Sequence, residues 1–253
     1  MSNPLLSEEN ISSKSLRKKS LVAFFILIAF LATAWYFFNY IKKQPEVAGT
    51  PRPLRKALNL NEKVFSTLFD SGKLVKEYPI SDAAKKVRVN GKDGLSDSIS
   101  EQSWRLKVVR SSGDTFSVSL DEIKQLPKKE IVFDFKCIEG WSQVSHWAGV
   151  PLKTFIEHYN LKAQSKMKYV GLQTPDKGYY VGIDMPSALQ QQTLLCYEMN
   201  GKPLPLNQGY PLRLIIPVKY GIKHLKRIGT MYFSNEKPPD FWAERGYDYY
   251  AGH

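Results

Sequence analysis

Residues 21–41 form a long apolar run with no charged side chain and no polar face. The run has about the length of one helix across a bilayer, and it ends in aromatic residues of the kind found at lipid–water interfaces, Trp35, Tyr36 and Tyr40. This pattern predicts a basic tail over residues 1–20 and a transmembrane anchor over residues 21–41. The alternative is a cleaved signal peptide, because Ala32-Thr33-Ala34 has the small-x-small form of a cleavage site. We favour retention of the segment, since the apolar run continues beyond Ala34.

Residues 42–58 carry three prolines, mixed charges and little periodicity, which predicts a linker. Beyond it, short strand patterns alternate with short helical patterns. Helices are predicted at 61–69, at 151–159 and from Ser119, where the sequence resembles a capped helix start. Strands are predicted at 104–109, 115–118, 131–136, 168–172, 179–183, 193–199, 212–216 and 227–233. The aromatic and polar tail from Glu236 is expected on the surface. The fold class predicted is α+β, as a single mixed, strand-rich domain over residues 59–253.

The composition is globular and the charge is strongly basic. Of 253 residues, 43% are hydrophobic, and the net charge is +12, which favours anionic partners such as phosphates, anionic lipid or acidic proteins. No nucleic-acid-binding motif accompanies this charge, so no nucleic-acid partner is expected. Two cysteines are too few for a disulfide scaffold or a cysteine-based zinc site, and the four histidines do not pair at a zinc-binding spacing.

Cys137 follows an apolar strand pattern and precedes a Gly-Trp turn, in Phe133-Asp134-Phe135-Lys136-Cys137-Ile138-Glu139-Gly140-Trp141-Ser142. A thiolate at the end of a strand can be a soft ligand of a metal cofactor. Taken alone, the residue favours a plainer interpretation: a buried free thiol, or a disulfide with Cys196 in an oxidising compartment. Cys196 itself lies in an apolar strand pattern and is expected to pack in the core.

A second segment, residues 204–228, combines glycine, proline and cationic side chains. A planar guanidinium such as that of Arg213 can bridge oxygen atoms in a bidentate manner. Lys223 and Lys226 follow Gly221 and are expected to converge on a phosphate together with backbone donors. Taken alone, these cations would more often be the solvated edge of a β-structure.

Together, the Cys137 segment and the Arg213–Lys226 segment resemble the sulfite-oxidase-type molybdopterin oxidoreductases, and the resemblance covers about residues 85–250. In that family one protein cysteine binds molybdenum directly, and a Gly-x-Pro-x-Arg segment and a Gly-x-Lys-x-x-Lys loop enclose the cofactor. The resemblance implies molybdopterin as the cofactor and Cys137 as the metal ligand. It also implies a set of cofactor-binding residues: Arg213 and Lys226, the amide of Gln208, backbone groups of His224 and Leu225, Thr174 and Asn90.

The order Cys137-Ile138-Glu139-Gly140-Trp141-Ser142 resembles the bacterial branch that includes the periplasmic methionine sulfoxide reductase catalytic subunit. A carboxylate two residues from a metal ligand could relay a proton, so Glu139 is predicted as a catalytic residue beside Cys137. The alternative for Glu139 is a structural salt bridge with a nearby lysine. Lys219 and Tyr220 are candidates to face the substrate.

The resemblance implies an oxygen-atom or two-electron transfer at a sulfoxide, sulfite or similar small oxyanion or sulfur centre by a membrane-anchored enzyme. Substrates would be small molecules or methionine sulfoxide. No haem signature is present, so electrons would pass through a separate partner, a membrane haem b protein or a cytochrome c. We expect a single-pass protein of the inner membrane with a periplasmic catalytic domain, because residues 15–21 resemble a twin-arginine export signal. The alternatives are a catalytically silent binding module of the same fold and a basic domain that engages anionic lipid or polymer.

Overall fold

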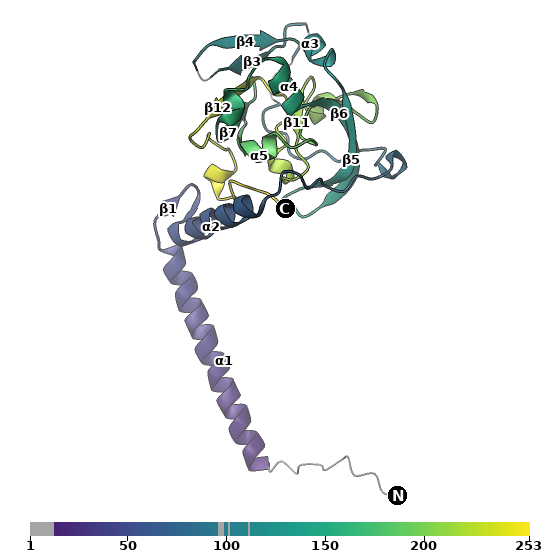
Figure 1. Cartoon of the computed structure of the whole chain (residues 1–253). Coiled ribbons are helices and arrows are strands. Elements are labelled where there is room, and N and C mark those ends of the chain that lie inside the picture. The colour runs from purple at the N-terminus through teal and green to yellow at the C-terminus, as the bar shows by residue number, and fades with distance from the viewer. Residues whose placement is uncertain (1–12, 96–98, 101, 111) are drawn as a thin grey trace, which may run out of the picture. The chain divides into compact units, whose positions relative to one another are not determined.

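The computed structural model describes residues 13–95, 99–100, 102–110 and 112–253, and divides into two compact units, Met1–Arg55 and Lys56–His253. The first unit is dominated by helix α1 (Ser13–Lys42), which contains the predicted anchor (Figure 1). At 1.5 Å per residue this helix is about 45 Å long. None of its side chains is buried, and it is long and apolar enough to cross a bilayer.

The segment predicted as a linker contains regular structure. A short hairpin of β1 (Glu46–Val47) and β2 (Thr50–Pro51) leads into helix α2 (Arg52–Leu68). The Arg55 guanidinium holds the hairpin by donating to the carbonyl oxygens of Val47 and Ala48. Helix α2 begins at Arg52 rather than Asn61, because prolines are tolerated in the first turn of a helix and do not exclude one here.

The second unit is built on two five-stranded sheets, one on each side of the domain in Figure 1. One sheet has the order β10–β9–β6–β5, with β11 also pairing with β9, and the other has the order β4–β3–β12–β7–β8. Every pair is antiparallel except β3 with β12. The strands are β3 (Leu106–Val109), β4 (Thr115–Val118), β5 (Lys129–Lys136), β6 (Ser142–Pro151), β7 (Tyr169–Gln173), β8 (Tyr180–Asp184), β9 (Leu194–Met199), β10 (Lys202–Pro203), β11 (Arg213–Ile215) and β12 (Thr230–Ser234).

Among the described residues, the α-helices between the strands of these sheets are α3 (Leu120–Lys124), α4 (Leu152–His158) and α5 (Met185–Ala188), and most of α2 also belongs to this unit. The predicted start of α3 is confirmed, since the Ser119 hydroxyl accepts from the Glu122 N–H and the Glu122 carboxylate accepts from the Ser119 N–H. Short 3-10 turns lie at Ile80–Asp82, Gln164–Lys166, Leu206–Gln208, Gly221–Lys223 and Ala243–Arg245. The predicted α+β class is confirmed.

The sheet that carries the candidate site is buried on both faces. In β9, Leu195 packs in the larger hydrophobic core, and its neighbours Leu194 and Cys196 pack in a second core on the other face. The prediction that Cys196 packs in the core is therefore confirmed. The second core also contains Phe133, Phe135 and Trp147 beside Cys137. This packing fixes the end of β5, where the thiol lies.

The prediction of a surface tail from Glu236 is wrong in part. Asp240, Ala243, Tyr250 and Ala251 are buried. The Asp240 carboxylate forms an ion pair with the Lys223 ammonium group, and both side chains are almost fully inaccessible. A buried lysine requires such a counter-ion, so the tail is part of the domain rather than a covering on it.

Candidate active site

The β5–β6 hairpin fixes the position of Cys137. The Cys137 N–H donates to the Trp141 carbonyl at 2.9 Å, and the Gly140 N–H donates to the Cys137 carbonyl at 3.1 Å. Gly140 has φ of +84°, a conformation that costs glycine little. The short loop therefore returns the chain directly into β6, and the thiol is held at its base.

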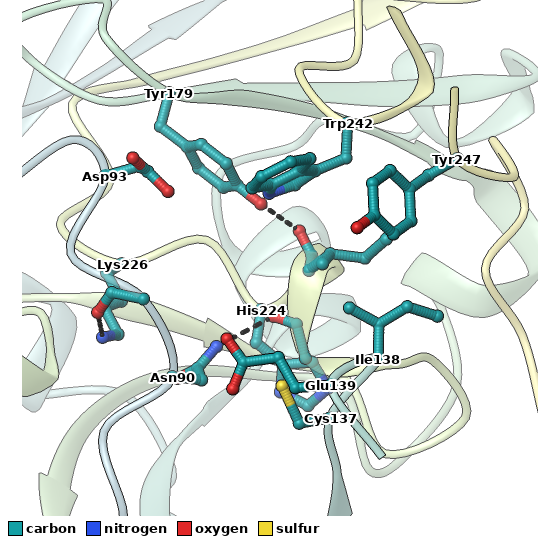
Figure 2. Close-up of a pocket in the computed structure, with 13 residues that line it drawn as sticks. Asn90, Asp93, Cys137, Ile138, Glu139, Tyr179, His224, Lys226, Trp242 and Tyr247 are labelled. Carbon is teal, nitrogen blue, oxygen red and sulfur yellow. Dashed lines mark hydrogen bonds between the residues drawn. The ribbon is translucent and has the colours of Figure 1, made fainter. Parts of the chain in front are cut away.

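Four segments distant in sequence meet around this thiol in one pocket (Figure 2). Five of the predicted site residues are brought together there: Asn90, Cys137, Glu139, His224 and Lys226. Figure 2 shows Cys137, Glu139, His224 and Asn90 on one side and three aromatic side chains, Tyr179, Trp242 and Tyr247, on the other. The pocket thus has a polar side that carries sulfur and an aromatic side that faces it.

Lys226 is the lysine that lines this pocket. Its ammonium group donates to the Gly91 carbonyl at 2.9 Å and to the Asn207 carbonyl at 3.0 Å, and no carboxylate of the described residues lies within ion-pair distance. Burial lowers the pKa of Lys226 to about 7, and the neighbouring charge of Arg213 acts in the same direction. The amine is held in place by carbonyl groups, and the charge of Asp93, which lies beyond ion-pair distance, offsets the lowering of its pKa only in part.

Asn90 links the segment around the Gly91 turn to the basic loop. Its side-chain amide donates to the Gly221 carbonyl at 3.1 Å. His224 lies behind it, with Nε2 3.0 Å from the Lys219 carbonyl and Nδ1 accepting from the Ile216 N–H at 3.4 Å. Burial, with a contribution from Arg213, lowers the pKa of His224 to about 3. The imidazole is therefore neutral at physiological pH and does not add a cation to the pocket.

Arg213 is fully buried on β11 and does not line the pocket. Its Nη1 donates to the backbone and side-chain oxygens of Gln208 at 3.0 and 2.9 Å, and its guanidinium lies 4.6 Å from the centre of the Trp147 ring. Its Nε has no hydrogen-bond partner among the described residues. Burial lowers the pKa of Arg213 to about 10, so the group stays charged at neutral pH.

Three further predicted contacts lie outside the lining. The Gln208 amide donates to the Val87 and Arg88 carbonyls, both at 3.3 Å. The Thr174 hydroxyl accepts from the Tyr179 N–H at 3.1 Å and thereby orders the turn that presents Tyr179. Leu225 packs in the core, its N–H donates to the Lys223 carbonyl and its own carbonyl accepts from Leu214. Direct contact of these residues with a cofactor stays a prediction.

Two predictions about lysines are wrong. Lys223 does not converge with Lys226, because its buried ammonium group is engaged by Asp240 and by the Gly182 carbonyl. Lys219 does not face a substrate: it is buried 2.7 Å from the Asp184 carboxylate. A buried ammonium group needs an anion, and both lysines already have one within the fold.

Cys137 and Cys196 are free thiols, so the disulfide interpretation is wrong. Burial raises the pKa of the Cys137 thiol, a hydrogen bond from the Glu139 backbone is the main opposing effect, and the charge of the Glu139 side chain raises the pKa further. A bound metal ion would replace the thiol proton and would stabilise the thiolate, which burial otherwise disfavours. Glu139 is exposed and accepts a hydrogen bond from the Trp141 indole N–H at 2.8 Å; it forms no ion pair with a described residue.

Sequence reasoning missed the aromatic side of the pocket and the nearby carboxylate of Asp93. Tyr179 donates to the Ile222 carbonyl at 2.6 Å. Trp242 and Tyr247 meet edge to face, with ring centres 5.0 Å apart. One signal of the aromatic side was available in the sequence: the tail from Glu236 is rich in aromatic residues. Exposed coil without a binding role seldom has such a composition.

The donor set fits molybdopterin, the cofactor that the sequence implies. Arg213 and Lys226 are buried cations without a carboxylate partner, which is costly unless an anion such as a phosphate is supplied. In the described part of the chain no three His, Cys, Asp or Glu residues gather as a metal site. The Cys137 thiol would therefore be the sole ligand from the protein, with the remaining ligands supplied by the cofactor.

Comparison with known proteins agrees with this chemistry. The family described as oxidoreductase molybdopterin binding domain matches residues 74–242. The "Putative protein-methionine-sulfoxide reductase subunit YedZ1" of Azospira oryzae is 35% identical over 195 residues, which are 76% of this chain and 73% of that protein. The protein-methionine-sulfoxide reductase catalytic subunit MsrP of Campylobacter jejuni is 30% identical over 174 residues, covering 62% of this chain and 59% of that subunit.

The crystal structure of the sulfane dehydrogenase SoxCD from Paracoccus pantotrophus matches with a TM-score of 0.51 at 17% identity, over 56% of this chain and 41% of that chain. That likeness shows the fold alone, and the matches span less than two thirds of both MsrP and the SoxCD chain. The family match and the fold nevertheless agree with the thiol and the unpaired cations of the pocket. The chain belongs to the sulfite-oxidase-type molybdopterin oxidoreductases and is a molybdenum-dependent enzyme of that family.

Proposed function

We propose that this protein is a membrane-anchored reductase that removes the oxygen atom from a neutral sulfoxide, with methionine sulfoxide as the substrate class. Two relatives carry names that refer to protein-methionine-sulfoxide reductase, and one of them aligns with three quarters of the chain. The relatives support the direction of the reaction, and the pocket supports the kind of substrate.

The aromatic side of the pocket is the observation that carries this proposal. Tyr179, Trp242 and Tyr247 face Cys137 across the pocket (Figure 2). The divalent sulfur of a thioether, the product of sulfoxide reduction, makes favourable contacts with aromatic rings, commonly at about 5 Å, and the methyl group of the sulfoxide can pack on the same rings. The corner formed by the Trp242 and Tyr247 rings therefore suits the end of a methionine sulfoxide side chain.

Sulfite fits the same lining less well. The carboxylates of Asp93 and Glu139 border the pocket together with a single lysine, Lys226. His224 adds no positive charge, because its pKa is lowered to about 3. A multiply charged anion would meet two carboxylates here, and like charges repel. A neutral sulfoxide avoids that repulsion.

We assign the residues of the site to two roles, binding of the cofactor and proton transfer. Cys137 would ligate the metal, and Lys226, Asn90 and the buried charge of Arg213 would hold the anionic part of the cofactor. The bound cofactor supplies a metal centre that accepts an oxygen atom and exchanges two electrons. The exposed Glu139 carboxylate, oriented by Trp141, can carry protons between solvent and the pocket. The overall step takes up two protons and two electrons and yields a thioether and water.

The electrons would come from a separate partner, a membrane haem b protein or a cytochrome c. We propose that α1 anchors the chain in the inner membrane with the catalytic domain in the periplasm. Its length and apolar composition support this, and an anchor would raise the local concentration of a membrane partner.

The test compares two activities of the purified full chain in detergent. Reduced benzyl viologen and methionine sulfoxide assay the reductive direction, and sulfite with ferricyanide assays the oxidative one. We expect sulfoxide reduction to dominate, and Trp242→Ala to raise KM for the sulfoxide more than it lowers kcat. Tyr247→Phe, which keeps the ring, is the matched control. Faster sulfite oxidation would refute the substrate class, and a molybdenum-replete protein without either activity would favour the silent module.

A further inference from the structure

Helix α2 has an exposed apolar face within the second unit. The face consists of Leu60, Val64, Phe65 and Leu68, which are 61%, 45%, 53% and 72% exposed. Residues four apart lie on the same side of an α-helix, so Leu60, Val64 and Leu68 form one stripe and Phe65 widens it. Exposed leucines are ordinary when single, but a continuous stripe of them indicates a surface that is covered by something else.

The other side of α2 is polar and is fastened to the domain. The Glu62 carboxylate accepts from the Lys237 ammonium group at 2.5 Å, and Phe69, directly after the helix, packs against the larger core. Lys56 and Lys63 are exposed on the polar side. Phe65 and Leu68 also border a pocket that Val218, Tyr250 and His253 of the same domain line, whereas Leu60 and Val64 lie outside that pocket. The apolar stripe therefore extends beyond the part of the helix that the domain borders.

The chain itself indicates what covers the stripe. The ten residue steps from Lys42, the end of α1, to Arg52, the start of α2, span at most about 36 Å. Any bilayer that holds α1 therefore lies within reach of α2. A helix with leucine and phenylalanine on one face and lysine and arginine on the other has the composition of helices that lie in a membrane interface. Lys56 and Lys63 on the polar side supply cations for anionic headgroups.

We propose that α2 lies in the interface of an anionic bilayer, with Leu60, Val64, Phe65 and Leu68 at the boundary of the acyl chains. This inference rests on the anchoring by α1 that belongs to the proposed function. It adds a second, peripheral attachment after the spanning helix. Two attachments restrict rotation of the catalytic domain about its anchor, and they would present its pocket to a membrane partner in a restricted range of orientations.

Site-specific photocrosslinking of the full chain tests the proposal. A diazirine amino acid is placed singly at Leu68, at Val64, at Lys63 on the polar side as the matched control, and at Phe30 within α1. Each protein is reconstituted into nanodiscs of phosphatidylethanolamine and phosphatidylglycerol, and adducts are identified by mass spectrometry. We expect lipid adducts at Phe30, Val64 and Leu68 in several-fold higher yield than at Lys63.

The four positions separate the possible failures. Lipid adducts at Phe30 with none at Val64 and Leu68 would overturn the docking of α2 while leaving the anchor intact. Absence of lipid adducts at Phe30 would overturn the anchor, and with it the premise of the inference. Protein adducts at Leu68 in place of lipid adducts would also overturn the proposal: adducts between two chains would show that a second copy covers the stripe, and adducts within one chain would show that the stripe packs on its own domain. As a second measurement, Leu68→Glu should lower the lipid adduct yield at Val64 several-fold without changing the melting temperature, because residue 68 is exposed.

Discussion

Replacing Lys226 by methionine tests whether this lysine is held in the pocket without a counter-ion. Burial lowers its pKa from 10.5 to about 7, and Arg213 assists. The unfolded chain would bind its proton throughout the interval from pH 7 to 10.5, whereas the folded apoprotein releases it. The unfolded state then binds more protons than the folded state, so the free energy of unfolding of the apoprotein should rise with pH in that window.

The size of the effect follows from the pKa. One pKa unit corresponds to about 1.4 kcal/mol, so between pH 7 and pH 9 the lysine contributes a rise of about 2 kcal/mol to the unfolding free energy. For a domain of this size that corresponds to a shift of about 4–8 °C in melting temperature. In Lys226→Met this contribution is absent. As the pH rises from 7 to 9, the unfolding free energy of the wild type should therefore rise by about 2 kcal/mol relative to that of the variant.

The assay is thermal unfolding of cofactor-free protein in detergent at pH 7 and pH 9. Lys219, whose pKa burial lowers to about 8, gives a slope of the same sign, but it is present in both proteins and cancels in the comparison. Lys92→Met, which removes an exposed lysine from the turn beside Gly91, is the matched control and should not alter the slope. An unchanged slope in Lys226→Met would show that the amine is neither buried nor unpaired as described.

The remaining predictions concern single groups. Cys137→Ser should keep the fold but lose equimolar molybdenum and oxidoreductase activity, as measured by metal analysis and turnover; a variant that kept both would remove the thiol from the mechanism. Gly149→Ala should lower the unfolding free energy by about 3 kcal/mol, because a new Cβ would lie 2.1 Å from the Leu195 carbonyl oxygen; an unchanged melting curve would contradict that geometry. Asp240→Asn should cost about 3–5 kcal/mol in a denaturant titration by leaving Lys223 buried without an anion, and a cost within experimental error would mean that water reaches the pair.

The elements with a strong local signal could be predicted from the sequence. Strand β4 occupies the predicted residues, and α3 begins where Ser119 and Glu122 form their reciprocal caps. In both cases the information lies in neighbouring side chains, either as alternation or as a cap. Strand β5 could also be predicted, because Ile131, Phe133 and Phe135 lie at alternate positions and pack together on one face. The predicted strand starts at residue 131, two residues after the observed start.

Strand β6 (Ser142–Pro151) was not predicted, although it is the longest strand of the described residues. Its second half is buried on both faces, so the alternation that marks a half-buried strand is missing. Gly149, which weakens the local strand signal, is required by the close approach of β9. The information that makes β6 a strand therefore lies in β9, about 50 residues further along the chain.

The candidate site shows the same division between local and distant information. Cys137 could be identified because a strand pattern, a turn and a family resemblance coincide at one position. Lys223 and Lys226 could not be told apart, since both are lysines of one basic loop and differ only in their surroundings. Asp240 engages Lys223 from the C-terminal tail, whereas the Lys226 ammonium group donates to the backbone carbonyls of Gly91 and Asn207.

That difference in partners bears directly on function. Lys223 is neutralised within the fold, so it serves the structure of the loop and joins it to the tail that carries Trp242. Lys226 has no carboxylate within ion-pair distance among the described residues, and burial lowers its pKa to about 7, so without a bound anion it keeps its charge only in part at neutral pH. A protein gains no stability from such an arrangement in isolation, so the charge is explained by an anion that arrives later. The family match identifies molybdopterin as the cofactor, and in our proposal the anionic part of that cofactor binds at the Lys226 ammonium group.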